Sequence, residues 1–296
     1  MASALPVATV GASQGTPYIV VALGDSYASG EGLYAGPTPG SAGSWLTRGD
    51  HPARHDDGCH RSPYSYPALS ARWLATRLHR PVILRFLACS GATTADLWAA
   101  PNRSPLLAGA EKLEAAQVTA RALRGANLVT ITIGGNDVGF VNVLGICELA
   151  SAVCTGSTGA GLAATLSHRI EALQATLSAT YAQVRRLAPH ATIDVVEYPA
   201  LFPPTSTSSC QGLAASTIPV FAAAEAQLNQ VTGAAARAAG VHVINPDSTG
   251  LFANHSVCSN SSLFGGIHSA YLAAAFHPTR AGQAAIARAL ELSLQG

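Results

Sequence analysis

Residues 18–27 read YIVVALGDSY, and this stretch is the clearest strand-and-turn pattern in the sequence. The apolar run 18–23 is followed at once by Gly24, which is typical of a buried strand that ends in a tight turn. Comparable runs recur along the chain, so further strands are expected at 82–87, 128–133, 193–196 and 241–244. Short, mostly apolar runs of this kind are typical of a parallel sheet that is covered on both faces.

Helices are expected between these strands. Apolar residues between Leu162 and Leu187 recur at spacings of three and four, which predicts one long amphipathic helix. Other helices are expected at 65–78, 111–123, 219–239 and 279–294, the last with Thr279 as its N-terminal cap. Alternating strands and helices favour an α/β domain. No linker or repeat divides the chain, so we expect one domain over 17–296 and a disordered tail over 1–16.

Composition excludes several classes of protein. The chain has 296 residues, with 17 Lys and Arg against 16 Asp and Glu, and its net charge is +1. A nucleic-acid-binding protein would show a basic footprint, so no nucleic-acid partner is expected. Hydrophobic residues make up 48% of the chain and charged residues 11%, which argues against disorder. No apolar stretch is long enough for a membrane span, so no stable membrane insertion is expected.

The cysteines indicate a compartment. The chain has six of them, at Cys59, Cys89, Cys147, Cys154, Cys210 and Cys258. An even number without a CxxC pair suits disulfides, which persist outside the cytosol. The alternative is six buried thiols in a cytosolic enzyme. Spacing does not choose a pairing, although Cys147 and Cys154 are close enough to enclose a small loop. Residues 1–14 contain no Lys or Arg and are not expected to form a complete signal peptide. Secretion is therefore predicted from the cysteines and the composition.

Three of the expected strands end in residues that suit catalysis, and ligands of open α/β sheets bind at such strand ends. Ser26 follows the first strand, where its hydroxyl would be exposed beside the N–H groups of a helix N-terminus. Gly91 follows the second strand and could bring its N–H close to a substrate. Asn136 follows the third and could direct its amide at a developing oxyanion. The structural alternatives are a helix-capping serine, a turn glycine and an Asx-type turn.

A general base is expected among the histidines. His277 stands just before the last helix, where a loop would project it over the sheet edge, although a surface or packing role is the alternative for any histidine. The loop 51–60 holds three histidines and two aspartates, which could bind a metal ion. Pro52 and Gly58 disfavour the helix that would align such ligands, so no metal site is expected.

Together these segments resemble the GDSL family of SGNH hydrolases. Residues 24–27 (GDSY) are similar to the family's first block, with Tyr27 in place of the usual Leu. Gly91 is similar to the glycine of the second block, residues 134–137 (GGND) match the third, and residues 276–278 (FHP) match the fifth. The blocks occur in the family's order and extend over most of the chain.

The resemblance implies roles for these residues. Ser26 would be the nucleophile and His277 the general acid and base. The N–H groups of Ser26 and Gly91 and the side chain of Asn136 would form the oxyanion hole.

The sequence departs from the pattern of many family members, which place an aspartate three residues before the histidine. Here that position is Ala274. A secreted actinobacterial branch of lipases and esterases uses a Ser–His dyad in which a main-chain carbonyl orients the imidazole, and Ala274 or Ala275 would supply it. A carbonyl can select the tautomer, but it does not balance the imidazolium charge as a carboxylate does. A distant acid such as Asp247 remains an alternative.

The resemblance also implies the fold and the activity. The expected fold is a three-layer α/β/α sandwich with a five-stranded parallel sheet, the flavodoxin-like fold of SGNH hydrolases. The same branch carries three consecutive disulfides, which would pair Cys59–Cys89, Cys147–Cys154 and Cys210–Cys258. The expected protein is a secreted, monomeric carboxylester hydrolase (a lipase, esterase or phospholipase) that forms an acyl-enzyme on small-molecule or lipid esters without a cofactor.

Two other functions remain open. A carbohydrate acetylesterase could use the same scaffold, with aromatic residues such as Trp45 and Tyr34 lining a sugar groove. A non-catalytic binding protein could have kept the fold without the reaction.

Overall fold

Five parallel strands form the centre of the structure, a computed structural model that describes residues 15–34, 43–46, 51, 58–99, 116–269 and 274–295. The strands are β1 (Tyr18–Gly24), β2 (Val82–Phe86), β3 (Leu128–Thr132), β4 (Thr192–Val196) and β5 (His242–Ile244). They lie in the order β2-β1-β3-β4-β5, and every neighbouring pair is parallel. This is the strand order of a flavodoxin-like sheet, so the predicted fold class is confirmed.

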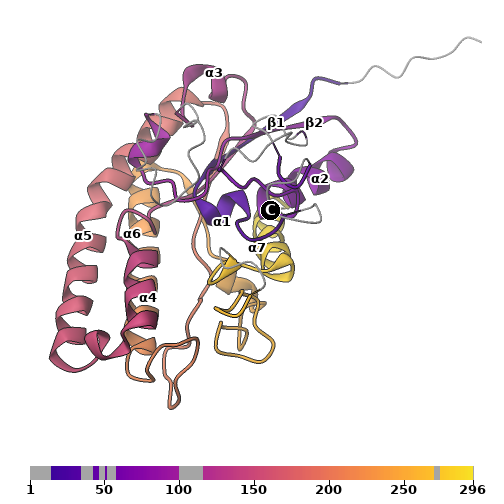
Figure 1. Cartoon of the computed structure of the whole chain (residues 1–296). Coiled ribbons are helices and arrows are strands. Elements are labelled where there is room, and N and C mark those ends of the chain that lie inside the picture. The colour runs from indigo at the N-terminus through magenta and orange to yellow at the C-terminus, as the bar shows by residue number, and fades with distance from the viewer. Residues whose placement is uncertain are drawn as a thin grey trace, which may run out of the picture.

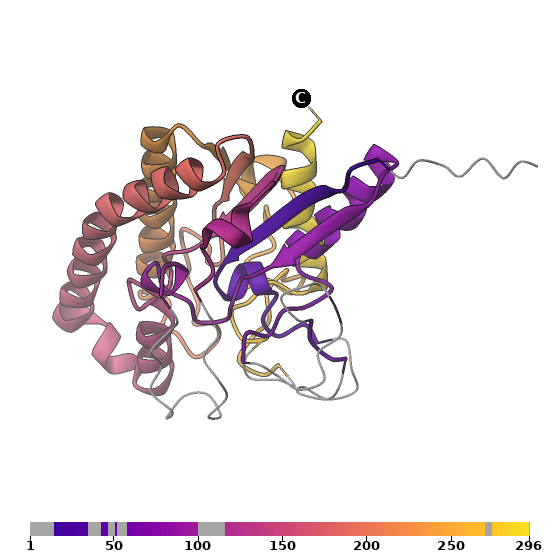
Figure 2. The same cartoon turned by 90° about the horizontal axis from the view of Figure 1, so that it is seen from above.

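Long helices cover both faces of the sheet. α2 (Tyr66–Leu78) packs against α7 (Arg280–Ser293) on one face, and α5 (Gly156–Leu187) packs against α6 (Ile218–Ala239) on the other (Figure 1, and from above in Figure 2). Every residue of β3 is buried, because this central strand meets helices on both sides. The hydroxyl of Thr279 caps α7 by accepting from the N–H of Gly282, as expected.

Shorter elements lie in the connections. A one-turn helix, α1 (Ser26–Ser29), follows β1, and α4 (Phe140–Leu149) follows β3 and stands beside α6 (Figure 1). The other short elements are η1 (Ala95–Leu97), α3 (Ala120–Leu123), η2 (Ser151–Cys154) and η3 (Pro246–Thr249). The loops that follow β1, β2, β3 and β4 meet at the carboxyl edge of the sheet, which is where the candidate site lies.

The helix expected at 111–123 is wrong for half of its described part, since residues 116–119 are not helical. Residues 111–115 lie outside the described residues, and the helix covers only Ala120–Leu123. Gln117 instead accepts from the N–H of Gly24 and donates to the carbonyl of Gly24, at 2.8 Å in both bonds. These bonds hold the segment against the end of β1. The helix begins only after Thr119, which caps it by accepting from the N–H of Ala122.

Disulfides tie the loops to the elements beside them. The pairs are Cys59–Cys89, Cys147–Cys154 and Cys210–Cys258, so the pairing that the resemblance implies is confirmed. The first joins the loop before α2 to the end of β2, and the second joins α4 to η2. The third joins the loop after β4 to the loop after β5.

Several expectations fall on residues outside the described part of the chain. Only 15 and 16 of the expected tail 1–16 are described, and 52–57 of the histidine-containing loop are not. Within the described ranges, no group of three or more His, Cys, Asp or Glu side chains could hold a metal ion. Within the same ranges, no helix is both long and apolar enough to cross a membrane. The domain boundary at 17 stays a prediction.

Candidate active site

Ser26 lies at the turn between β1 and α1. β1 ends at Gly24 with a φ of +127°, and a Cβ there would come within 2.1 Å of the carbonyl oxygen of Thr132, so only glycine fits. Asp25 caps α1 by accepting from the N–H of Tyr27 at 3.0 Å. Ser26 is thus the first residue of the helix rather than its cap, which corrects the capping alternative. The N–H groups of a first helical turn have no partner within the helix.

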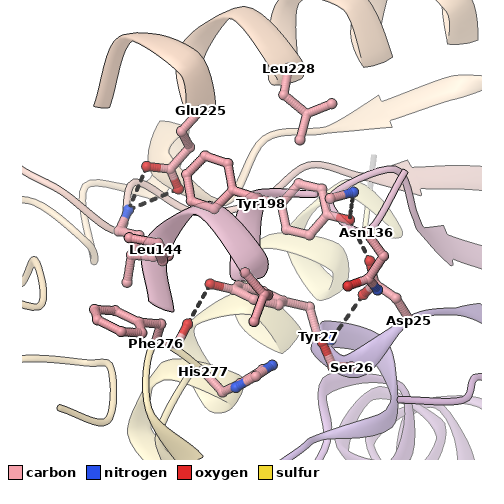
Figure 3. A pocket seen from close by; sticks show the side chains of 14 residues that line it. Asp25, Ser26, Tyr27, Asn136, Leu144, Tyr198, Glu225, Leu228, Phe276 and His277 are labelled. Atoms are coloured by element: carbon pink, nitrogen blue, oxygen red, sulfur yellow. Dashed lines mark hydrogen bonds between the residues drawn. The ribbon is translucent and has the colours of Figure 1, made fainter. Parts of the chain in front are cut away.

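Tyr198 connects three strand ends next to this turn. It follows β4, and its hydroxyl donates to Oδ2 of Asp25 at 2.5 Å while it accepts from the N–H of Gly135, after β3, at 2.9 Å (Figure 3). Asn229 of α6 holds the main chain of Tyr198 by accepting from its N–H and donating to its carbonyl. The network therefore determines the spacing between the turns that follow β1 and β3.

Asp25 is buried within this network. Burial raises the pKa of its carboxyl from 3.8 to about 7, and the hydrogen bonds from Tyr198 and from the N–H of Tyr27 oppose this rise without cancelling it. The residue next to the candidate nucleophile therefore titrates near neutral pH.

We expect this carboxyl to make stability depend on pH. The folded-state pKa lies above the unfolded value, so the folded chain holds the proton more tightly, and the free energy of unfolding falls as pH rises from about 4 to about 7. Relative to Asp25→Asn, which does not titrate, the wild type should lose a few kcal/mol of stability over that range. Urea denaturation of both proteins at several pH values measures this. A difference between them that stays constant with pH would contradict the expectation.

Asn136 lies in the turn after β3, and its Nδ2 donates to the carbonyl of Ala92 at 2.9 Å. The carboxylate of Asp137 accepts from both the N–H and the hydroxyl of Thr94. These contacts join the turn after β3 to the turn after β2. Gly91 lies in that second turn, exposed and with a φ of +73°. It is next to Ala92 in the chain but is not among the residues that line the cleft described below.

His277 precedes α7 in a segment held by Gly265. The N–H of Gly265 donates to the carbonyl of His277 at 2.9 Å, and the N–H of Phe276 donates to the carbonyl of Gly265 at 2.7 Å. Nδ1 of His277 lies 3.0 Å from the carbonyl oxygen of Ala275. The carbonyl of Ala274 instead accepts from the main-chain N–H of His277 at 3.1 Å. Of the two carbonyls that the resemblance suggested, the one at the ring is therefore that of Ala275.

Asp247 does not lie at this ring nitrogen. Its two carboxylate oxygens accept from the N–H of Ala200, each at 3.1 Å, so it supports the loop after β4.

Tyr27 joins the serine turn to the histidine segment. Its hydroxyl donates to the carbonyl of Phe276 at 2.7 Å, and its ring centroid lies 5.5 Å from that of His277 (Figure 3). Phe276 has a left-handed φ of +62°, a conformation that costs about 1–3 kcal/mol in a residue with a side chain. The bond from Tyr27 helps to hold this strained residue directly before the histidine.

Glu31 places a second, unpredicted carboxylate near the site. It is buried, and its Oε2 lies 2.6 Å from Nδ1 of His60, whose ring stacks on Trp45. Burial by itself would raise the pKa of Glu31. The hydrogen bond and charge of His60, with smaller effects from His277 and Ser90, outweigh burial and hold the pKa below its usual value. An ionised carboxylate therefore lies within electrostatic reach of His277.

Ser26, Asn136 and His277 line one cleft, and the imidazole is turned toward the serine (Figure 3). The cleft contains about 530 Å³, part of it open to solvent. Apolar side chains form much of its wall, namely Phe140, Val141, Leu144, Leu201, Leu228 and Phe276. Glu225 also lines the cleft, and its buried carboxyl accepts from the N–H of Leu201 at 2.9 Å. Burial raises the pKa of this carboxyl well above its usual value.

The comparisons with known proteins agree with this geometry. The model of the GDSL-like lipase/acylhydrolase family matches residues 22–285. The chain belongs to this family. As a GDSL-like acylhydrolase, it is a serine ester hydrolase of the lipase and esterase class.

Streptomyces proteins are among the relatives of this GDSL-like chain. It is 34% identical to "Lipase" of Streptomyces rimosus, over 91% of this chain and 83% of that protein, and 31% identical to "Lipase 1" of Streptomyces coelicolor, over 89% and 81%. The solved extracellular lipase of Streptomyces rimosus has a TM-score of 0.69 at 29% identity and covers 93% of this chain and 99% of its own. Phospholipase A1 of Streptomyces albidoflavus has a TM-score of 0.68 at 28% identity, over 94% and 99%.

Sequence reasoning missed several residues of the site. Tyr198, Glu31 and Glu225 reach it from a loop, a turn and a helix that no motif marks. Tyr27 stood in the first block only as a departure from the usual Leu, although its hydroxyl is what reaches the histidine segment. For Tyr198 the signal available was its place directly after an expected strand, which many non-functional residues share.

Proposed function

We propose that this GDSL-like hydrolase is a secreted carboxylester hydrolase that acts on lipid esters through Ser26 and His277. The observation that carries the proposal is that both side chains line one apolar cleft with Asn136, on the fold of a lipase family.

The first half of the reaction acylates the serine. Nε2 of His277 takes the proton of the Ser26 hydroxyl as its oxygen attacks the ester carbonyl. The negative charge that develops on the carbonyl oxygen is stabilised by the N–H groups of Ser26 and Gly91 and by Nδ2 of Asn136. The imidazolium then gives its proton to the departing alkoxide, which leaves as the alcohol.

The second half hydrolyses the acyl-enzyme. A water molecule attacks the acyl carbonyl while His277 takes one of its protons. The tetrahedral intermediate then collapses, His277 returns the proton to Ser26, and the carboxylic acid leaves. The balance is one ester and one water consumed for one alcohol and one acid, so the chemistry requires no cofactor.

A main-chain carbonyl orients the ring of His277. The carbonyl of Ala275, at 3.0 Å from Nδ1, favours the tautomer that carries the proton on Nδ1, which leaves Nε2 as the base. Glu31 supplies the negative charge at longer range and stabilises the imidazolium that forms in each half-reaction.

An apolar cleft supports an acyl chain as the group that is bound. The Streptomyces relatives named as lipases and as phospholipase A1 support lipid esters in the same way. The carbohydrate acetylesterase has no comparable support, since Trp45, which was to line a sugar groove, is completely buried. Three disulfides and the similarity to the extracellular lipase of Streptomyces rimosus support secretion.

An active-site phosphonate tests the proposal. We expect a fluorophosphonate probe to form one covalent adduct per chain, and peptide mass spectrometry should locate it on Ser26. Hydrolysis of 4-nitrophenyl butyrate should fall in proportion to the labelled fraction, because the probe occupies the same nucleophile. Heat-unfolded protein serves as the control and should not react. Full ester hydrolysis by stoichiometrically labelled protein would refute the assignment.

A further inference from the structure

An uncharged apolar surface lies outside the cleft, on α4 and η2. Val141 is 56% exposed, Ile146 55%, Leu149 91% and Val153 43%. These four aliphatic residues, which we call the α4 surface, occupy adjacent turns of two consecutive elements. Large exposed aliphatic side chains in one place are unusual in a protein that presents this surface only to water.

The segment that carries the α4 surface has little charge of its own, and Arg169 of α5 approaches it only at the N-terminal end of α4, where Nη1 donates to the carbonyl of Val138 at 3.3 Å. Residues 138–167 contain a single Asp, Glu, Lys or Arg, which is Glu148. One oxygen of its carboxylate, Oε1, is buried without a hydrogen-bond partner, and burial raises the pKa of the group. Its backbone and side chain lie against Gly212 of the neighbouring loop. The one ionisable group of this segment is thus partly withdrawn from the solvent.

The α4 surface is continuous with the wall of the cleft. Val141 is both exposed and a lining residue, and Phe140 and Leu144 of the same helix line the cleft as well. One side of α4 therefore meets the bound substrate while another meets the surroundings. The Cys147–Cys154 disulfide holds η2, which carries Val153, to α4.

We propose that the α4 surface docks the enzyme on aggregated lipid substrate, with its aliphatic side chains inserted among the acyl chains of a micelle, emulsion or bilayer surface. This proposal rests on the proposed lipid-ester activity. It adds which surface of the enzyme contacts the aggregated lipid. An ester that leaves the aggregate next to Val141 enters the cleft directly from the surface that holds the enzyme.

The chemistry of the α4 surface favours lipid over a protein partner. Protein interfaces are enriched in Tyr, Trp and Arg and carry directional hydrogen bonds, whereas these four residues are all aliphatic. The exposed residues between them are small, uncharged ones such as Ser151 and Ala152. With a net charge of +1, the chain does not depend on anionic headgroups for attraction, so docking on zwitterionic or neutral lipid is expected.

Vesicle binding by an inactive enzyme tests the proposal. In a Ser26→Ala background, which cannot consume the lipid, co-flotation with phosphatidylcholine vesicles measures the partition coefficient. Adding Ile146→Ser and Leu149→Ser should lower that coefficient at least about tenfold, because each substitution removes a large apolar side chain from the contact. Neither residue lines the cleft.

The matched control replaces two exposed leucines on the other helices, Leu78→Ser on α2 and Leu292→Ser on α7. Leu78 is 37% exposed and Leu292 43%, and both lie on the layer opposite to α5 and α6. We expect this control pair to leave the partition coefficient within about twofold. With Ser26 intact, both pairs should hydrolyse monomeric 4-nitrophenyl butyrate at the wild-type rate, and only the α4 pair should lose activity on an emulsified ester. Thermal melting verifies that both pairs remain folded.

Three results would overturn the proposal. The first is vesicle binding that does not differ between the two pairs of substitutions, and the second is the absence of binding in the unsubstituted background. The third is a dimer in light scattering that the α4 pair abolishes, because the surface would then join two copies of this chain. Failure of the wild-type enzyme to hydrolyse the soluble ester would instead count against the proposed function. The flotation result is independent of it, since vesicle binding requires no catalysis.

Discussion

Replacing Ser26 with alanine is expected to lower kcat for a soluble ester by about 10³–10⁶-fold. The hydroxyl is the atom that bonds to the acyl group, and no neighbouring side chain of α1 can substitute for it. KM should change little, because the acyl cleft remains. Stopped assays with 4-nitrophenyl butyrate at high enzyme concentration can measure the residual rate, which comes from the oxyanion hole and from binding.

A second serine on the same helix provides the control. Ser29 is completely buried three residues later, and its hydroxyl bonds to the carbonyl of Ser26 at 3.3 Å. Ser29→Ala should retain kcat within a few-fold, although it removes a buried hydroxyl from the same turn. If Ser26→Ala and Ser29→Ala lost activity equally, the structure of the turn rather than the nucleophile would explain the loss.

Replacing Asn136 with alanine is expected to lower kcat by about 10²–10³-fold. Nδ2 of Asn136 would donate to the oxyanion, which exists only in the transition state and the tetrahedral intermediates, so KM should remain nearly constant. The same amide donates to the carbonyl of Ala92 at 2.9 Å. The substitution therefore also loosens the turn that carries Gly91.

An exposed asparagine outside the cleft provides the control for Asn136→Ala. Asn142 lies on α4 and does not line the cleft. Asn142→Ala should retain kcat on the soluble ester. A rise in KM for Asn136→Ala with an unchanged kcat would contradict a role in the oxyanion hole and would assign Asn136 to substrate binding.

The sequence predicted the sheet better than it predicted the loops. The five strands were recognisable because short apolar runs end at glycine or polar turns, and Ser26 lies where the first of those strands ends. α4 gave no such signal, because its exposed Val141, Ile146 and Leu149 blur the one-sided pattern that marks an amphipathic helix. The helix expected from residue 111 failed at Gln117, whose long-range bonds to Gly24 overrode local propensity.

The residues that hold the candidate site in place could not be predicted either, because they too depend on contacts between distant parts of the sequence. Tyr198 bonds to Asp25 across 173 positions, and His60 pairs with Glu31 across 29. Contacts of this kind depend on which loops the fold brings together, and nothing in the local pattern of either residue encodes the partner. The sequence showed that Ala274 stands where many family members have an aspartate. It did not show whether the carbonyl of Ala274 or that of Ala275 lies at the histidine ring.

The bond between Tyr27 and Phe276 has a consequence for how this enzyme becomes active. It joins positions 249 residues apart, so the two halves of the dyad cannot be brought into register until synthesis has passed His277. All five strands are synthesised before that point, so the sheet can form on the ribosome before the catalytic pair is complete. A single proteolytic cut between Cys258 and Phe276 would place Tyr27 and its partner on separate fragments that only non-covalent contacts hold together.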